Sequence, residues 1–299
     1  MPSESGAVMN FQIEQRGRDY WARTGQEPCF FVGRRVRYQG RLGLSNAVPG
    51  APLVAADAYR AQDYTETFGI WAHILAPIIA CEGGRFTALN SYDRAAFSFG
   101  VGQFAAHVPE GDFVCLMRRL LALPEAKSYF PELGLAKGRI ARVGTDPQPL
   151  EDAVSTAALM AWFNPDAAAI DAAEVQAAAR LIHWTRTRPA ARRAQMAQMV
   201  VSARAHIQRA LQKLSLASLA APYCIVLIDL LHHGRGGGKL WPKVAAALAA
   251  ADPLAALLAI GAGQWAGRVA QLRADIATMP YLGGVSWDAA TGDWRGGPI

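Results

Sequence analysis

The sequence lacks the features that mark exported and membrane-spanning proteins. It starts MPSESGAVMNFQIEQRGRDYW, without a basic start followed by an apolar run, so no secretory signal is predicted. The longest apolar stretch, residues 216–231, is too short to cross a membrane comfortably, and it contains Pro222 and Asp229. We therefore expect a buried helix there.

Motifs for metal, phosphate or nucleophilic serine chemistry are also missing. The cysteines have neither CxxC nor Cys/His ligand spacing, which predicts free thiols rather than a zinc site: Cys29, Cys81, Cys115 and Cys224. No HExxH, EF-hand or GxSxG pattern occurs. HHGRGGGKL at 232–240 departs from a phosphate-binding loop, because His233 replaces its first glycine and Leu240 its Ser/Thr. That segment is typical of a helix end followed by a glycine loop, and we expect no metal and no cofactor.

The composition indicates an ordered, basic protein. Of 299 residues, 52% are hydrophobic and 18% charged, which allows one large domain or two ordinary ones with a sizeable core. The net charge is +6, so the surface should attract anionic polymers. Nucleic acid, anionic lipid and bacterial wall polymers all fit this description, and charge alone does not choose among them.

The chain divides into an N-terminal extension, residues 1–54, and a larger domain, residues 55–299. A short helical start precedes PCFFVGRRVRYQGRLGL at 28–44, whose alternation and glycines predict a possible β-hairpin with a basic outer face. After residue 55 alanine-rich helices dominate, and strand signals are sparse after residue 105. The helices are expected at about 58–81, 112–123, 150–163, 167–185, 189–214, 217–232, 240–250 and 261–277. The Gly- and Trp-rich tail is irregular or a short hairpin.

One carboxylate stands out at the end of a predicted helix. The sequence FGIWAHILAPIIACEGG is apolar nearly all round, so the helix should run through the core, with His73 as a hydrogen-bonded core residue. Gly83 and Gly84 should end it, since glycine tolerates the left-handed conformation there. Burial and the negative end of the helix dipole would both favour the protonated form of Glu82, as a general acid requires.

A second carboxylate follows eleven residues later. Asp93 lies in the polar, turn-like run NSYD, and FSFGVGQF comes next with glycines at 100 and 102. These glycines permit sharp turns or close backbone approach. Two carboxylates, one at a buried helix end and one on a polar loop, are the groups that glycosidic cleavage uses. Glu110 and Asp112 are reserve candidates for the second carboxylate, with capping of the next helix as their simpler interpretation.

These residues resemble the lysozyme-like superfamily, which includes goose-type lysozymes, lytic transglycosylases and chitosanases. The resemblance covers residues 66–107, and a weaker similarity is present at CIVLIDLLHHGRG. It departs in a shorter Glu–Asp interval than in chitosanases and in Gly83, where transglycosylases usually have Ser. It implies a mainly α (α+β) fold, a lysozyme-like helical domain with a small β element after the catalytic Glu. It also implies Glu82 as the acid, Asp93 as the base or water-positioning group, and a set of glycan-contacting residues: Tyr92, Ser98, Gly100 and Gln103.

The resulting functional hypothesis is a muramidase-type peptidoglycan hydrolase. A chitosanase, a lytic transglycosylase, or a non-catalytic wall-binding component of a phage tail or secretion apparatus are the alternatives. The protein would be made in the cytoplasm and act on the cell wall after signal-independent delivery, with delivery machinery or an immunity protein as possible partners. The arginines of residues 166–214 read as a solvated helix surface, so no nucleic acid partner is expected.

Overall fold

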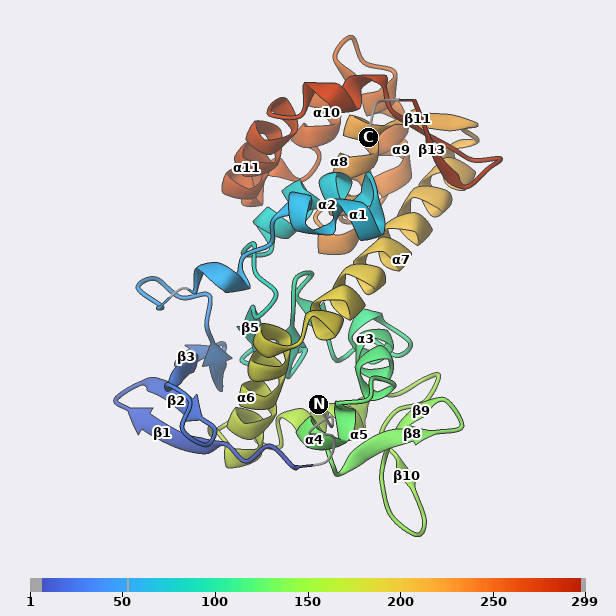
Figure 1. The fold of residues 1–299 in the computed structure, drawn as a ribbon. Helices are drawn as coiled ribbons and strands as arrows, with labels where there is room; N and C mark the ends of the chain where they lie inside the picture. Colours follow the sequence, from blue (N-terminus) through green and yellow to red (C-terminus); the bar gives the residue numbers. More distant parts are fainter. Residues whose placement is uncertain (1–6, 53, 297–299) are drawn as a thin grey trace. The chain divides into compact units, whose positions relative to one another are not determined.

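The computed structural model describes residues 7–52 and 54–296. Helices hold 46% of the residues and strands 18%. The chain forms two compact units (Figure 1). The first unit contains the described residues up to Ala58 and Arg85–Gln198, and the second contains Tyr59–Gly84 and the described residues from Met199 on. These units do not follow the expected boundary at residue 54, because the N-terminal segment groups with residues 85–198.

A seven-stranded antiparallel sheet dominates the start of the first unit. Its strands follow one another in sequence order: β1 (Gln12–Arg16), β2 (Asp19–Arg23), β3 (Phe30–Tyr38), β4 (Arg41–Ser45), β5 (Leu89–Asn90), β6 (Ser98–Phe99) and β7 (Phe104–Ala105). The expected β3–β4 hairpin is confirmed, and Arg35 and Arg37 are exposed on it. The expected helical start is wrong, since β1 and β2 form a hairpin with Gly17 at φ +65° in its turn.

This sheet corrects the fold class. The expectation of a mainly α, lysozyme-like helical domain with a small β element is wrong, and the fold is α+β. The physical reason is that residues 12–45 are not an appendage. Their four strands continue through the pairing of Ser45 with Asn90 into β5–β7, so one sheet joins the N-terminal segment to the loop that carries Asp93.

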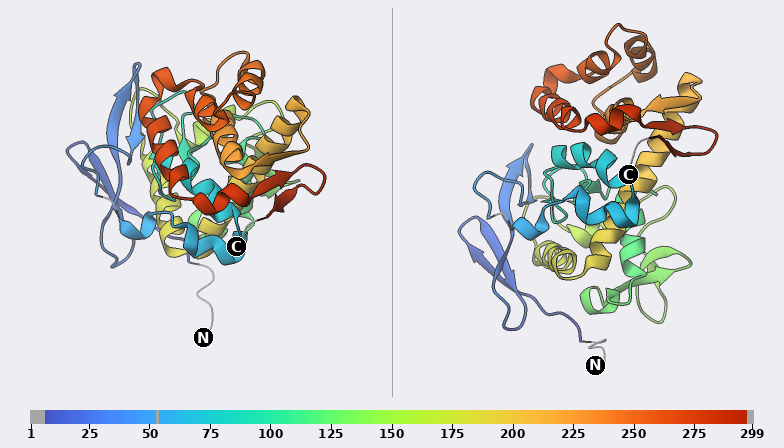
Figure 2. Two further views of the ribbon diagram at one scale, coloured as in Figure 1. Left: turned by 90° about the horizontal axis from the view of Figure 1, so that it is seen from above. Right: turned by 45° about the horizontal axis from the view of Figure 1, so that its top comes forward.

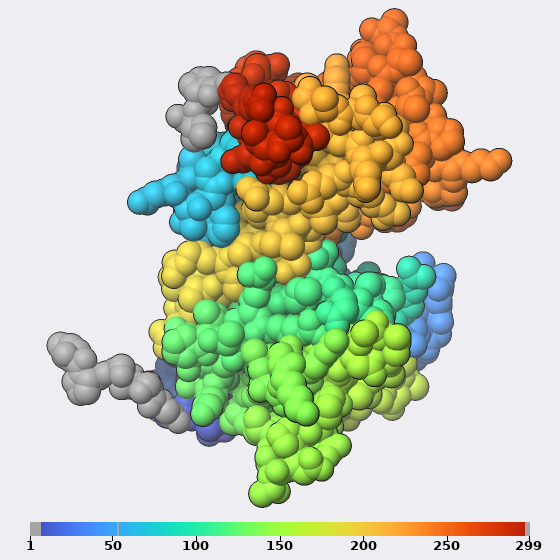
Figure 3. Space-filling model, turned by 90° about the vertical axis from the view of Figure 1, so that its right-hand side faces the viewer, coloured from blue at the N-terminus to red at the C-terminus, as the bar shows by residue number. Residues whose placement is uncertain are grey.

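Short helices and a second sheet complete the first unit. They are η1 (Ala55–Asp57), α3 (Asp112–Leu121), α4 (Ala126–Tyr129), α5 (Ala157–Phe163), α6 (Ala172–Thr187) and the strands β8 (Leu133–Ala136), β9 (Arg139–Arg142) and β10 (Gln148–Pro149). The sparse strand signals after residue 105 missed β8–β10, which lie in the yellow-green region of Figure 3. Phe97, Phe113 and Phe163 are fully buried and pack edge-to-face or tilted, with ring centroids 4.7–5.8 Å apart. They form an aromatic core under the sheet.

The second unit is built around one apolar helix, α2 (Trp71–Cys81). The elements of this unit are η2 (Ala61–Tyr64), α1 (Thr65–Phe68), α2, β11 (Ser218–Ala220), α8 (Ala221–His233), α9 (Leu240–Leu248), α10 (Pro253–Ala259), η3 (Ala262–Gln264), α11 (Ala266–Ala277), η4 (Pro280–Gly284), β12 (Ser286–Asp288) and β13 (Asp293–Arg295). Helix α2 contacts both α8 and α11 (Figure 2). The unit boundary falls within α7 (Pro189–Leu214), between Gln198 and Met199.

The tail and the apolar stretch of residues 216–231 have structures that the sequence predicts. The tail forms the β12–β13 hairpin, and β11 pairs with β12 beside it, where the red and gold segments meet in Figure 3. Trp71 packs against Trp287 and Trp294 with centroids 5.2–5.4 Å apart. Helix α8 is a buried helix, as expected for residues 216–231. Among the described residues, no helix combines the length and the apolar character that a membrane crossing needs.

Candidate active site

Glu82 lies at the C-terminal end of α2, as the sequence predicts. The helix is buried along Ile74, Leu75 and Ile78, all without solvent exposure. Glu82 follows its last residue, Cys81, and the chain then turns through Gly83 at φ +96° and Gly84 at φ +67°. A residue with a side chain would be strained in that left-handed conformation. The glycine pair therefore fixes where the helix ends and where Glu82 emerges.

A buried guanidinium holds the carboxylate of Glu82. Nη2 of Arg268, on α11, donates to Glu82 Oε1 over 2.7 Å, and its Nη1 donates to the carbonyl of Cys81 over 3.3 Å. Both side chains are largely shielded, with 9% of Arg268 and 14% of Glu82 exposed. The sequence suggested an apolar surrounding for this carboxyl group. The structure instead gives it a charged partner 186 residues away along the chain.

The ion pair belongs to a longer buried network. Arg268 Nε donates to Asp229 Oδ1 over 2.8 Å, and Arg235 Nε donates to Asp229 Oδ2 over 2.7 Å. Neither Asp229 nor Arg235 has any exposed side-chain surface. The four groups alternate in sign, Arg235, Asp229, Arg268 and Glu82, and their formal charges sum to zero. Burial opposes the charge on Arg268, but Glu82 and Asp229 together raise its pKa above the usual value.

Two backbone carbonyls extend this network around Arg235. Its Nη1 donates to the carbonyls of Leu258, in the last turn of α10, and Ile260, which directly follows that helix. Gly261 is needed here, because a Cβ at that position would lie 2.2 Å from the carbonyl oxygen of Arg235. Buried ions are tolerated only when they are paired and hydrogen-bonded in this way. The sequence contained one signal of the network, the lone Asp229 in an apolar helix. A buried aspartate is almost always paired, so its position indicated a partner.

The two oxygens of Glu82 differ in their surroundings. Arg268 binds Oε1, and His232 Nε2, at the end of α8, approaches the same oxygen to 3.9 Å. Among residues 7–52 and 54–296, none forms a hydrogen bond with Oε2. The arrangement therefore leaves one defined oxygen of the carboxyl group available to carry and deliver a proton.

Asp93 lies in the first unit, on the loop between β5 and β6. Its Oδ1 accepts a hydrogen bond from the backbone N–H of Ala95 over 2.8 Å, and its Oδ2 accepts one from Asn90 Nδ2 over 3.1 Å. The side chain is half-buried. Since Glu82 belongs to the second unit, neither unit contains both predicted carboxylates.

A buried carboxyl group that the sequence did not suggest holds the loop of Asp93. Ser91 Oγ donates to Glu174 Oε1, at the start of α6, and the backbone N–H of Leu44 donates to the same oxygen over 3.2 Å. Asn164 Nδ2 donates to the carbonyls of Ser91 and Ala96, both over 2.9 Å. Burial raises the pKa of Glu174 to about 7, so the acid that anchors this loop is about half protonated near neutral pH.

The predicted glycan-contacting residues have different environments. Ser98 is buried in β6, and Gly100 is buried at φ +92°, with Gln195 Oε1 only 2.6 Å from where a Cβ would be. The predicted close approach at Gly100 is thus made to a side chain of the protein itself. Gln103 is partly exposed, but its Nε2 is buried and has no hydrogen-bond partner among the described residues.

Tyr92 lies in a small group beside Asp93 that the sequence did not fully reveal. Its ring is half-buried and packs edge-on against Tyr38 of β3, with centroids 5.9 Å apart. Tyr38 is 50% exposed. His107 lies within electrostatic range of both Asp93 and Arg94, and burial lowers its pKa. The sequence around Asp93 could not reveal Tyr38, because Tyr38 belongs to a strand more than fifty residues earlier.

The reserve carboxylates have structural partners. Glu110 forms ion pairs with Arg118 and Arg139, which lower its pKa, and the buried Glu151 joins the same two arginines. Asp112 begins α3 and accepts a hydrogen bond from Gln198 over 2.9 Å. The expected capping by these side chains is wrong, since Gly111 is the N-cap and no side chain caps the helix. Glu110 is therefore committed to an ion-pair cluster.

Within the described residues, no group of three His, Cys, Asp or Glu side chains is placed to hold a metal ion. No protein-family model matches this chain, and neither a curated protein nor a solved structure matches it significantly.

Proposed function

We propose that this protein is a glycoside hydrolase that cleaves bacterial cell-wall glycan, with Glu82 as its general acid. The observation that carries the proposal is the asymmetry of the Glu82 carboxyl group. Oε1 is bound by Arg268, whereas Oε2 accepts no hydrogen bond from a described residue. A proton on Glu82 would then reside on Oε2, which suits transfer to a leaving oxygen.

The reaction follows the usual course for two carboxyl groups. Glu82 gives its proton to the glycosidic oxygen as the bond from that oxygen to the anomeric carbon breaks, and the positive charge spreads over the sugar ring. Water then adds to the anomeric carbon and loses its proton to a base, for which Asp93 stays the sequence-based prediction. Arg268 is a positioning residue, because it acts through Glu82 by fixing which oxygen carries the proton.

Surface charge favours a polyanionic wall polymer as the substrate. Exposed arginines cover the strands and turn of β1–β3: Arg16, Arg18, Arg23, Arg35 and Arg37. Only one of these five, Arg16, forms an ion pair with a described residue, Glu14. A basic sheet attracts peptidoglycan and its attached anionic polymers, whereas it repels a polycation such as chitosan.

Digestion of purified wall sacculi tests the proposal. We expect soluble muropeptides from the native protein and a loss of at least about a hundredfold in Glu82→Gln, the scale for removal of a general acid. Glu66→Gln, an exposed glutamate on α1 of the same unit, is the matched control and should retain full activity. Asp93→Asn should also lose activity if Asp93 receives the proton from water.

The products separate the related possibilities. Reducing ends indicate hydrolysis, anhydro-sugars indicate a lytic transglycosylase, and release of fragments only from chitosan would assign a different polymer. Equal turnover by the native protein and Glu82→Gln removes Glu82 from the mechanism. No release from any of these polymers by the native protein would mean that the proposal is wrong.

A further inference from the structure

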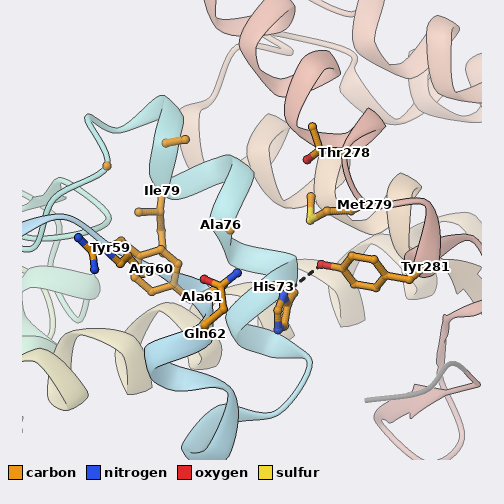
Figure 4. A pocket seen from close by; sticks show the side chains of 12 residues that line it. Tyr59, Arg60, Ala61, Gln62, His73, Ala76, Ile79, Thr278, Met279 and Tyr281 are labelled. Carbon is orange, nitrogen blue, oxygen red and sulfur yellow. Dashed lines mark hydrogen bonds between the residues drawn. The ribbon is translucent and has the colours of Figure 1, made fainter.

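The second unit contains an open cavity of about 540 Å³ that the proposed mechanism does not use (Figure 4). Three segments of this unit line it. They are the stretch from Tyr59 through the start of η2, the outer face of α2, and the turn from α11 into η4. Glu82 is not among the lining residues, but Gly84, two residues beyond it, is.

The floor of the cavity is apolar and includes two alanines. Ala76 and Ile79 of α2 lie along it, and Met279 faces them from the segment after α11 (Figure 4). Ala80 also lines the cavity. Ile79 is buried, whereas Ala80 is exposed to the cavity and solvent. Such an apolar floor accepts small apolar groups such as methyl groups.

A cation stands at one side of this floor. Arg60 lines the cavity and is exposed, and its guanidinium has no ion pair or hydrogen bond with any residue in the described ranges. Gln62 lies beside it, also exposed. Five N–H groups of a guanidinium in a fixed fork match the two oxygens of a carboxylate. This side of the cavity therefore favours an acidic group.

The opposite side offers acceptors, because a chain of hydrogen bonds fixes the direction of each proton. Thr65 Oγ1 donates to the carbonyl of Ala61, so it accepts from His73 Nε2, each over 3.0 Å. His73 Nδ1 must then accept from the hydroxyl of Tyr281, also over 3.0 Å. In this neutral state of His73 the phenolic oxygen of Tyr281 is left as an acceptor. Thr278 behaves alike, since its hydroxyl donates to the carbonyl of Asp275.

The cavity thus matches a ligand with a carboxylate at one end, an amide N–H at the other and small apolar groups between. We propose that it binds the peptide stem of peptidoglycan, which combines alanine methyl groups with free carboxylates. The inference rests on the proposed function and names the substrate within it. A stem of about five residues spans roughly 17 Å when extended, so a sugar near Glu82 can have its stem in the cavity beside Gly84.

Titration with N-acetylmuramyl-L-alanyl-D-isoglutamine, followed by calorimetry, tests the cavity directly. We expect Arg60→Gln to weaken binding at least about tenfold, as loss of a charged hydrogen bond does. Ala76→Trp should abolish it by filling the floor. Arg273→Gln, an exposed arginine of α11 outside the cavity, should bind as the native protein does, and the probe with its carboxylate amidated should bind as weakly as Arg60→Gln does.

Thermal melting of each variant shows whether it is folded. Because Arg60→Gln and Ala76→Trp alter different sides of the cavity, the proposal can still be tested if one of them does not fold. The proposal is overturned if the native protein does not bind the probe. It is also overturned if Arg60→Gln and Ala76→Trp both bind the probe as tightly as the native protein does.

Catalysis distinguishes failure of this inference from failure of the proposed function. Glu82→Gln should bind the probe normally while losing hydrolysis. The native protein should digest intact peptidoglycan faster than glycan strands whose stems have been removed, and Arg60→Gln should lose most of that preference. Hydrolysis without any preference for stems rejects the inference alone, whereas binding without hydrolysis of any glycan rejects the proposed function alone.

Discussion

The two units hold their candidate carboxylates by opposite means. In the second unit, Glu82 is held by alternating buried charges that run through Arg268 to Asp229 and Arg235. In the first unit, the loop of Asp93 is anchored through Ser91 to Glu174, whose pKa of about 7 leaves it mostly neutral below that pH. Charge pairing resists pH changes near neutrality, whereas an anchor that titrates there does not. The two units should therefore respond differently to pH and to mutation.

The largest expected effect comes from removing the centre of the ionic network. Asp229→Leu leaves Arg235 and Arg268 buried without their shared anion, and loss of one buried partner costs about 3–5 kcal/mol of unfolding free energy. Chemical denaturation measures it. Asp252→Leu, an exposed aspartate at the start of α10, is the control and should cost no more than about 2 kcal/mol, the scale for losing a helix cap. A loss below about 1 kcal/mol for Asp229→Leu would mean that the charges are not truly buried.

Glu174→Gln should stabilise the first unit at alkaline pH. The pKa of Glu174 is raised from 4.5 to about 7 by burial, so the unfolded chain releases its proton first as the pH rises. Stability is therefore greatest below pH 4.5 and falls until about pH 7, by on the order of 2–3 kcal/mol. Glutamine cannot ionise, so this slope should disappear when unfolding is measured from pH 4 to pH 8. An unchanged slope in Glu174→Gln would assign the pH dependence to other groups.

Gly100→Ala probes a backbone position in the loop after β6. Its φ of +92° strains any residue with a side chain, and the added Cβ would meet Gln195 Oε1 at 2.6 Å. We expect a loss of about 2 kcal/mol, combining backbone strain with displacement of Gln195 from the N–H of Val101. Gly144→Ala, where nothing lies within 4 Å of the new Cβ, should change stability by less than about 0.5 kcal/mol. Equal effects at both positions would contradict the close packing at Gly100.

Tyr38→Ala should have the smallest effect on stability. Half of Tyr38 is exposed, and its one ring contact is with Tyr92, so we expect a loss of about 1 kcal/mol. If the ring pair also contacts glycan, the KM for soluble wall fragments should rise while kcat stays nearly constant. A fall in kcat alone would show instead that Tyr38 positions the loop of Asp93.

Local signals predicted the end of α2 well. The apolar helix and the two glycines after Glu82 are properties of neighbouring residues, and both are present. The partners of Glu82 could not be predicted in the same way, because Arg268 is 186 residues away. Which arginine pairs with a carboxylate depends on how α8 and α11 pack against α2, and no local pattern encodes that.

The first hairpin of the N-terminal sheet, β1–β2, was missed for a different physical reason. Strand β1 has four exposed residues and one that is partly exposed, so its sequence QIEQR shows no alternation of buried and exposed positions. A strand at the edge of a sheet needs none, since it is stabilised by pairing with its neighbour. The glycine of its turn, Gly17, was the available local signal, and it was too weak to outweigh the helical interpretation.

The zero sum of the four buried charges has a consequence for how this sequence can change over time. Replacing Asp229 alone leaves Arg235 without an anion, and replacing Arg268 alone leaves Glu82 without its hydrogen-bonded cation, so neither step is tolerated without a compensating change at that partner. Substitutions at these positions should therefore be inherited together. A relative that has lost Arg235 should also carry an uncharged residue at the position of Asp229 or a new cation beside it.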